Sequence, residues 1–252
     1  MPEEISTIPV KLYTEKITRG HAGNISFFAG VEGFYHMGFE IIEVQNLEDL
    51  SIETDNVFFG SIGFVQNALK KLNIEVPEHI DYPESLSKFY GRKITESTIN
   101  TISNNPDLWN VFVKPKGKLK KFTGRHIKTT YDLIGCGDPD GDVPVWVSEP
   151  VSFVSEWRVF VRYGKILGVK LYKGDWRNHF DHKIIEEAVS LYQNAPAGYA
   201  MDFGLTTDGR LLIVEVNEGY AIGNYGLFYI DYAKLISARW AEMTGQEDLC
   251  NF

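Results

Sequence analysis

The sequence of 252 residues contains no long apolar run and only two cysteines. No stretch approaches the roughly 20 apolar residues that a membrane-spanning helix requires. The first residues, MPEEISTIPVKLY, form neither a basic nor an apolar signal segment. Cys136 and Cys250 lie far apart without a CxxC partner, which argues against a disulfide framework and a thiolate metal site. We therefore expect a cytoplasmic protein without a membrane segment.

The sequence also lacks excess positive charge and a cluster of histidines. Its net charge of −9 argues against nucleic acid bound across the whole surface. His179 and His182 have a ligand-like spacing, but no further His or Cys completes a metal shell. We find no Ser/His/Asp or Cys/His arrangement, P-loop or dinucleotide fingerprint. Carboxylates and basic side chains are therefore the groups that can carry chemistry here.

The composition is that of an ordinary globular protein, with 44% hydrophobic and 13% aromatic residues. Short apolar runs at 8–13, 39–44 and 56–59 predict strands. Residues 25–37 and 61–72 predict helices between and after them. This alternation predicts a small α/β layer at the N-terminus.

A polar stretch with several prolines, 76–106, predicts a linker that contains one short helix near 83–89. We place a domain boundary near residue 92, between an N-terminal α/β domain (1–92) and a larger second domain (93–252). The second domain is predicted to contain strands at 109–114, 143–149, 156–162 and 166–172, a later hairpin, and helices at 183–192 and 230–244. The expected fold class is α/β (α+β).

The most informative segment is YAMDFGLTTDGRLLIVEVNEG. An Asp-Gly pair between two apolar runs, here Asp208 and Gly209, predicts a β-hairpin. Strict pairing around a two-residue loop places Asp202 directly opposite Glu215. Asn217 then follows on the same face, because side chains in a strand alternate between faces.

These three side chains predict a site for a divalent cation. Two carboxylates that face each other across buried strands destabilise a sheet unless a cation lies between them. Oxygen ligands without thiolate or imidazole favour Mg²⁺ or Mn²⁺. The alternative is a surface hairpin with solvated acids, but the run Leu211 to Val214 has no polar face. We therefore prefer the metal site.

A second group of charged residues predicts contacts with phosphate. Seven basic side chains lie between Lys114 and Lys128 in an otherwise acidic chain. Lys114 ends an apolar run and can hold an ammonium as a point charge above an anion. The alternatives are a solvated basic loop and a nucleic-acid groove. The groove would require interleaved aromatic residues, and only Phe122 qualifies.

The strand pair EWRVFVRYGKILGVKLYKGD contains two further cations whose relation depends on its turn. A three-residue loop makes Arg158 and Lys170 cross-strand neighbours, whereas a two-residue loop places them on opposite faces. Two adjacent cations repel each other, so the first arrangement implies an anion such as a polyphosphate between them. The sequence leaves both arrangements open.

With these residues considered together, most of residues 109–220 resembles the ATP-grasp superfamily, whose members include D-alanine:D-alanine ligase. The spacing of Asp202, Glu215 and Asn217 is similar to the magnesium-binding set of that family. The run VFVKP resembles its first phosphate-binding segment, with Lys114 as the lysine. The second phosphate-binding lysine of the family has four candidates here, which are Lys116, Lys118, Lys120 and Lys121.

Two further segments extend the resemblance. VWVSEPV resembles the adenine hinge, in which backbone groups of Glu149 and Val151, on either side of Pro150, bond the base. Glu156 resembles the acid that binds the ribose, and Arg158 resembles the basic residue directed at phosphate or acyl phosphate. The N-terminal part resembles the α/β domain that precedes many ATP-grasp modules, and DYPESLSKFYGR resembles an often phage-borne clade.

The resemblance implies a carboxylate-amine ligase that uses ATP and Mg²⁺ and acts through an acyl phosphate. Arg158 and Lys170 are then the catalytic cations, and the substrates are a small-molecule or peptide carboxylate and an amine. One alternative is a kinase-like phosphotransferase, and another is a catalytically silent ATP-binding module. A ligase that modifies nucleic acid is the third. The sequence does not define the oligomeric state.

Overall fold

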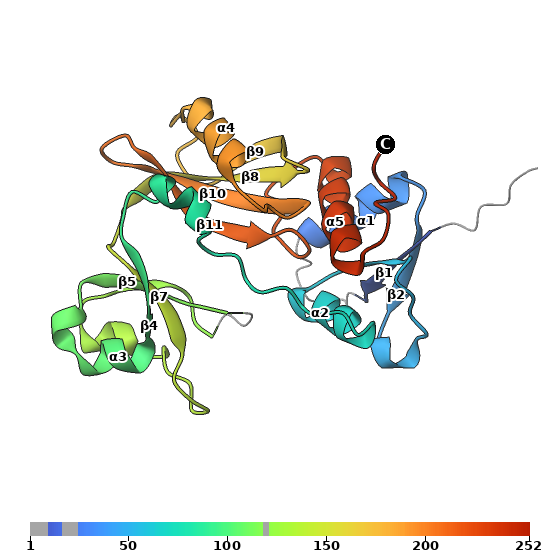
Figure 1. The fold of residues 1–252 in the computed structure, drawn as a ribbon. Helices are drawn as coiled ribbons and strands as arrows, with labels where there is room; N and C mark the ends of the chain where they lie inside the picture. The colour runs from blue at the N-terminus through green and yellow to red at the C-terminus, as the bar shows by residue number, and fades with distance from the viewer. Residues whose placement is uncertain (1–9, 17–24, 118–120) are drawn as a thin grey trace, which may run out of the picture.

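Three separate β-sheets organise the protein (Figure 1). The computed structural model describes residues 10–16, 25–117 and 121–252. Strands and helices are both well represented, so the predicted α/β (α+β) class is confirmed. Within these described ranges, no helix is long and apolar enough to cross a bilayer.

The first sheet is a parallel layer at the N-terminus. Its strands are β1 (Lys11–Glu15), β2 (Glu40–Val44) and β3 (Val57–Phe59), in the order β2-β1-β3. Helix α1 (Ile25–His36) connects β1 to β2, and α2 (Ile62–Lys71) follows β3. The predicted alternation is confirmed. The first strand lies later than its predicted range, 8–13, whose first two residues are outside the described part of the chain.

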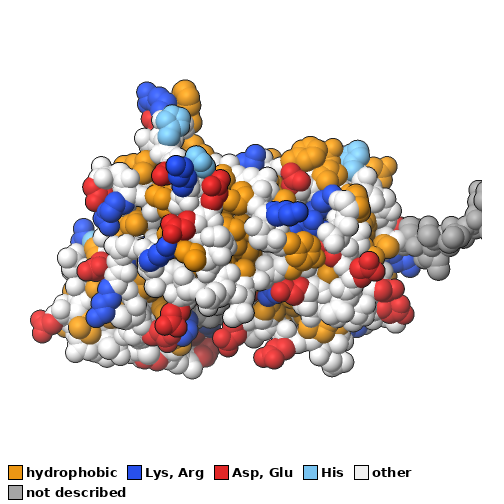
Figure 2. All heavy atoms as spheres, turned by 45° about the horizontal axis from the view of Figure 1, so that its top comes forward, with side chains coloured by type: hydrophobic (Ala, Val, Ile, Leu, Met, Phe, Trp, Pro, Cys, Tyr) orange, Lys and Arg blue, Asp and Glu red, His pale blue; other side chains and the backbone are white. Residues whose placement is uncertain are grey.

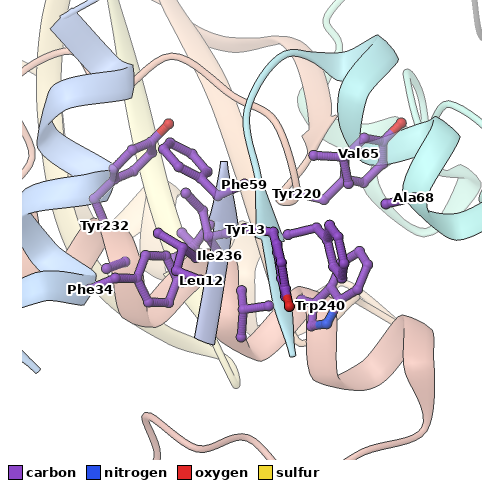
Figure 3. Packing of buried hydrophobic residues seen from close by; sticks show 14 of the residues in the cluster. Leu12, Tyr13, Phe34, Phe59, Val65, Ala68, Tyr220, Tyr232, Ile236 and Trp240 are labelled. Atoms are coloured by element: carbon purple, nitrogen blue, oxygen red, sulfur yellow. The ribbon is translucent and has the colours of Figure 1, made fainter. Parts of the chain in front are cut away.

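The C-terminal helix α5 (Tyr229–Thr244) packs against this N-terminal layer. Figure 3 shows Tyr232, Ile236 and Trp240 of α5 beside buried residues of β1 and β3. The Trp240 indole donates a hydrogen bond to the backbone oxygen of Asn56 over 2.8 Å. The first and last parts of the chain therefore share one hydrophobic cluster. The domain boundary near residue 92 stays a prediction.

The second sheet is small and antiparallel, in the order β4-β7-β5-β6. Its strands are β4 (Ile94–Thr98), β5 (Val111–Pro115), β6 (Arg125–Ile127) and β7 (Pro144–Ser148), and α3 (Ile99–Asn104) follows β4. Four short 3₁₀ helices occur in the described residues, at Leu47–Asp49, Glu84–Phe89, Pro106–Leu108 and Thr130–Leu133. The predicted linker is thus wrong from residue 94 onward. Ile99 and Ile102 are buried and anchor the small core of this sheet.

The third sheet contains the longest strands, in the order β11-β10-β8-β9. They are β8 (Phe153–Arg162), β9 (Lys165–Gly174), β10 (Gly198–Thr206) and β11 (Leu211–Glu218). Helix α4 (His182–Leu191) covers one face, where Ile185 and Ala188 join the apolar cluster of the sheet. The other face turns toward the second sheet.

The predicted pairing of Asp202 with Glu215 is confirmed, but the turn is longer than expected. Leu205 pairs with Leu211, so the loop comprises Thr207, Asp208 and Gly209. Gly209 adopts a φ of 84°, as in three-residue hairpin loops that end in a left-handed residue. A bulge at Val214 then restores the register. The extra loop residue and the extra strand residue offset each other.

The β8–β9 hairpin combines the two predicted alternatives. Its loop has only two residues, Tyr163 and Gly164, both with positive φ, as a type I′ turn requires. Arg158 nevertheless pairs directly with Lys170, because a bulge at Leu167 shifts the register by one residue. Loop length alone therefore did not determine which face each cation occupies.

Candidate active site

A row of four charged side chains crosses one face of the third sheet. Directly paired residues in neighbouring antiparallel strands lie on the same face. The row runs from β9 through β8 and β10 to β11, in the order Lys170, Arg158, Asp202, Glu215. Two cations therefore lie beside two carboxylates, and Asn217 follows Glu215 on the same face.

Arg158 and Asp202 form the central pair of this row. The Arg158 Nε and Nη2 atoms donate to the two carboxylate oxygens of Asp202, each over 2.7 Å. Both residues are more than 90% buried. Burial lowers the pKa of the Arg158 guanidinium, but the hydrogen bonds and charge of Asp202 outweigh it and raise the pKa above its ordinary value. This bidentate geometry is the strongest form of such a pair. Asn217 Nδ2 donates to Asp202 Oδ2 over 3.3 Å.

Lys114 reaches the row from the second sheet. Its Nζ lies 2.8 Å from Oε2 of Glu215 and 2.5 Å from Oδ1 of Asp81. The Lys114 side chain is 13% exposed. Burial lowers the pKa of this ammonium, but the nearby charges of Glu215, Tyr82 and Asp81 raise it by more. Residues predicted separately, Lys114 and Glu215, are thus brought together across the space between two sheets.

Asp81 was missed by the sequence analysis. It lies in the segment that was read as a linker, yet it is 2% exposed. Its Oδ2 accepts a hydrogen bond from Trp146 Nε1 over 2.8 Å, and His79 Nδ1 lies 3.3 Å from Oδ1. Burial acts to raise the pKa of Asp81, but His79 and Lys114 outweigh it and lower the pKa to about 2. No spacing in the sequence connects this acid to Lys114.

Glu156, the predicted ribose-binding acid, is buried on β8. The Tyr172 hydroxyl donates to its Oε2 over 2.7 Å, and Lys173 pairs with its Oε1. Tyr172 stacks on Tyr225 with ring centroids 4.8 Å apart, and the Arg158 guanidinium lies 4.6 Å from the Tyr225 ring centroid. Two aromatic rings therefore border the cationic end of the row. The ribose role of Glu156 stays a prediction.

The predicted adenine hinge, Glu149 to Val151, connects β7 of the second sheet to β8 of the third. The Glu149 side chain accepts a hydrogen bond from the backbone N–H of Lys93 over 3.1 Å. Pro150 offers no N–H, so only its neighbours can present both a donor and an acceptor. Contact with a base stays a prediction for all three residues.

The second phosphate-binding lysine also stays open among its four candidates. Lys118 and Lys120 lie outside the described residues. Lys116 pairs with Glu96 over 2.5 Å, and Lys121 pairs with Asp138 over 2.5 Å. Figure 2 shows acidic and basic side chains interspersed over one face of the molecule.

The predicted metal ligands have the donor chemistry for Mg²⁺. Asp202, Glu215 and Asn217 offer only oxygen donors from two adjacent strands. Among the described residues, no group of three or more His, Cys, Asp or Glu side chains is arranged to hold a metal, so the amide oxygen is needed as the third donor. Arg158 and Lys114 hold positive charge against these carboxylates, where a cation is predicted. The residues fit the ion, and their role as its ligands stays a prediction.

Comparison with solved structures defines the fold. D-alanine–D-alanine ligase from Bacillus anthracis is similar over 95% of this chain and 99% of its own, with 13% identity and a TM-score of 0.55. N5-carboxyaminoimidazole synthetase from Staphylococcus aureus, complexed with ADP, covers 94% and 78%, with 13% identity and a TM-score of 0.54. VanG D-Ala:D-Ser ligase from Enterococcus faecalis covers 95% and 98%, with 14% identity and a TM-score of 0.53. At these identities the similarity establishes a shared fold, that of the ATP-grasp ligases.

The family follows from the sequence itself. The model of an ATP-grasp domain family, the second family of its clade, matches residues 89–235, more than half of the chain. The protein therefore belongs to this ATP-grasp family, and the predicted superfamily is confirmed. A comparison with curated proteins found no match.

Proposed function

We propose that this protein is an ATP- and Mg²⁺-dependent carboxylate-amine ligase that acts through an acyl phosphate. The observation that carries the proposal is the row of Lys170, Arg158, Asp202 and Glu215, with Lys114 facing it from the second sheet. Membership of the ATP-grasp family supports nucleotide binding at this face.

The charges of the site suit a triphosphate with a metal ion. Asp202, Glu215 and Asn217 would hold Mg²⁺, which when bound offsets charge on the phosphate oxygens. In the structure, Arg158 and Lys114 neutralise the two carboxylates. Once the carboxylates serve a metal, both cations are available to phosphate. Arg158 presents a planar fork and Lys114 a point charge, two complementary ways to bind phosphoryl oxygens.

The remaining predicted residues orient the substrates. Backbone groups of Glu149 and Val151 would bond the adenine, and Glu156 would accept from the ribose hydroxyls. Lys170, paired directly with Arg158, adds positive charge beside the transferred group. Alignment and fixed charge are the principal contributions of a protein to phosphoryl transfer.

The proposed reaction has two steps. An oxygen of the substrate carboxylate attacks the γ-phosphorus of ATP, the bond to the β-phosphate oxygen breaks, and ADP leaves. The amine nitrogen then attacks the carbonyl carbon of the acyl phosphate, phosphate leaves, and the nitrogen loses a proton. The products are an amide, ADP, phosphate and one proton. Exclusion of water protects the acyl phosphate between the steps.

Mass spectrometry of reaction mixtures tests this proposal. The protein is incubated with Mg²⁺, ATP and a panel of amino acids and short peptides. We expect a product whose mass is the sum of two reactants less one water, formed in equal amount with ADP and phosphate. A product that retains phosphate would replace the ligase with the kinase-like alternative. ATP that binds but is not consumed would indicate a silent module.

A further inference from the structure

Asp81 holds an unusual position between the second and third sheets. The chain passes from α2 toward the third sheet below β11 (Figure 1). Asp81 forms an isolated bridge with Val216, whose backbone N–H donates to the backbone oxygen of Asp81 over 2.9 Å. Asp81 also has a φ of 53°, a left-handed conformation that is uncommon outside glycine. The backbone is thus fixed beside the predicted metal-binding strand.

The Asp81 side chain is directed at one cation. Oδ1 lies 2.5 Å from Lys114 Nζ, and Oδ2 is held by Trp146 Nε1 over 2.8 Å. The ammonium also lies 4.8 Å from the ring centroid of Tyr82, the next residue along the chain. A buried carboxylate is costly unless it is paired. Asp81 is paired with Lys114, His79 and Trp146 at once, which a simple linker does not require.

Lys114 consequently has two carboxylate partners with different surroundings. Glu215 lies at the end of the charged row and is a predicted metal ligand, whereas Asp81 lies outside that row. A carboxylate cannot serve a divalent cation and an ammonium equally well through the same oxygens. If Glu215 turns to a metal, Asp81 still holds the ammonium in place.

We propose that Asp81 is a positioning residue, which retains the Lys114 ammonium at the site when Glu215 is engaged by the metal. This inference rests on the proposed function, and it adds a residue outside the predicted nucleotide and metal ligands. Without Asp81, the buried ammonium would have Glu215 as its carboxylate partner among the described residues, and it would compete with the metal for that oxygen.

The first test uses neither metal nor nucleotide. Lys114 is labelled with an amine-reactive acetylating reagent, and the rate is read from the modified peptide by mass spectrometry. In Asp81→Asn we expect labelling to be faster by roughly tenfold, since a hydrogen bond to a charged group commonly contributes that much to an equilibrium. Lys71, which donates to the backbone oxygens of Leu47 and Glu48, is the control lysine in the same sample. An unchanged rate at Lys114 would overturn the proposal.

The second test measures the Mg²⁺ concentration that gives half of the ATP-dependent rise in melting temperature. We expect Asp81→Asn to raise this midpoint severalfold, whereas a merely structural loss would lower the melting temperature and leave the midpoint in place. Asp248→Asn is the matched control, because Asp248 is a buried partner of Arg162 outside the charged row. The same midpoint in Asp81→Asn and wild type would contradict the positioning role.

A milder variant covers the case in which Asp81→Asn does not fold. Trp146→Phe removes only the hydrogen bond that fixes Asp81 Oδ2. Faster labelling of Lys114 in this variant supports the proposal, and an unchanged rate overturns it. Failure of the proposed function is distinguishable, because wild type itself would then show no Mg²⁺-dependent response to ATP while the labelling result stands by itself.

Discussion

The two faces of the third sheet are built from the same four strands but differ in every respect. One face packs Trp157, Val159, Met201 and Phe203 against α4 and is apolar. The other carries the charged row, with one residue from each strand. Because side chains alternate along a strand, Asp202 projects to one face while its neighbours Met201 and Phe203 project to the other. The sheet thus combines a rigid apolar support with a charged surface.

This difference bears on function because charge is an inefficient way to stabilise a sheet. Replacing a buried ion pair with apolar side chains of similar volume is often neutral or stabilising. The apolar face therefore explains why the sheet folds, and the charged face calls for another reason. Binding of a metal and a phosphorylated ligand supplies that reason.

The largest expected effect comes from the apolar face. Phe203→Ala should lower the free energy of unfolding by about 3–5 kcal/mol, because Phe203 is fully buried and its removal leaves a cavity. Urea unfolding followed by circular dichroism measures the change. A loss below about 1 kcal/mol would mean that this face is not the main support of the sheet.

The charged face should respond to loss of one partner more strongly than to loss of both. Arg158→Met leaves Asp202 buried without its main partner and should cost about 3 kcal/mol of unfolding free energy. The double variant with Asp202→Leu should recover most of that loss. A double-mutant cycle by urea unfolding measures the coupling. Additive effects would show that the pair is not coupled.

Lys114→Ala should weaken ATP binding by about 1.5–3 kcal/mol while the protein still unfolds cooperatively, since it removes a charged donor predicted to contact phosphate. Isothermal calorimetry with ATP and Mg²⁺ gives the affinity. Lys88→Ala is a control, because Lys88 forms an exposed pair with Glu187 on another part of the surface. Equal affinity in wild type and Lys114→Ala would remove Lys114 from the site.

The smallest effect is expected at the hairpin turn. Gly209→Ala places a Cβ at a φ of 84° and should cost about 1 kcal/mol of unfolding free energy. The stabilisation by ATP and Mg²⁺ should be unchanged, because the bulge at Val214 separates the loop from the Asp202–Glu215 pair. A changed response to ATP would show that the turn and the charged face are coupled.

The sequence predicted the parts of the fold and site that depend on local patterns. The hairpin and the opposition of Asp202 and Glu215 follow from an Asp-Gly turn between apolar runs. The bulges at Val214 and Leu167 could not be predicted, since two-residue periodicity does not record an inserted residue. The pairing of Arg158 with Lys170 was left open for this reason.

Contacts between distant segments were the harder part. Lys114 was predicted to meet phosphate, but its contact with Glu215 requires two sheets to face each other. Asp81 was not identified, because its role arises from a left-handed backbone and a bridge to Val216. Strand β4 and helix α3 were missed because their sequence, ITESTINTISN, is polar and buries only a few apolar residues.

The most direct test of the account is the melting temperature of wild type and of the Asp202→Asn, Glu215→Gln double variant, with ATP in the presence and absence of Mg²⁺. A ligand that binds only the folded state raises the melting temperature. We predict a rise in wild type that depends on Mg²⁺, and loss of that metal-dependent part in the double variant. A double variant that responds to ATP and Mg²⁺ as wild type does would contradict the assignment of the charged face as the metal and nucleotide site.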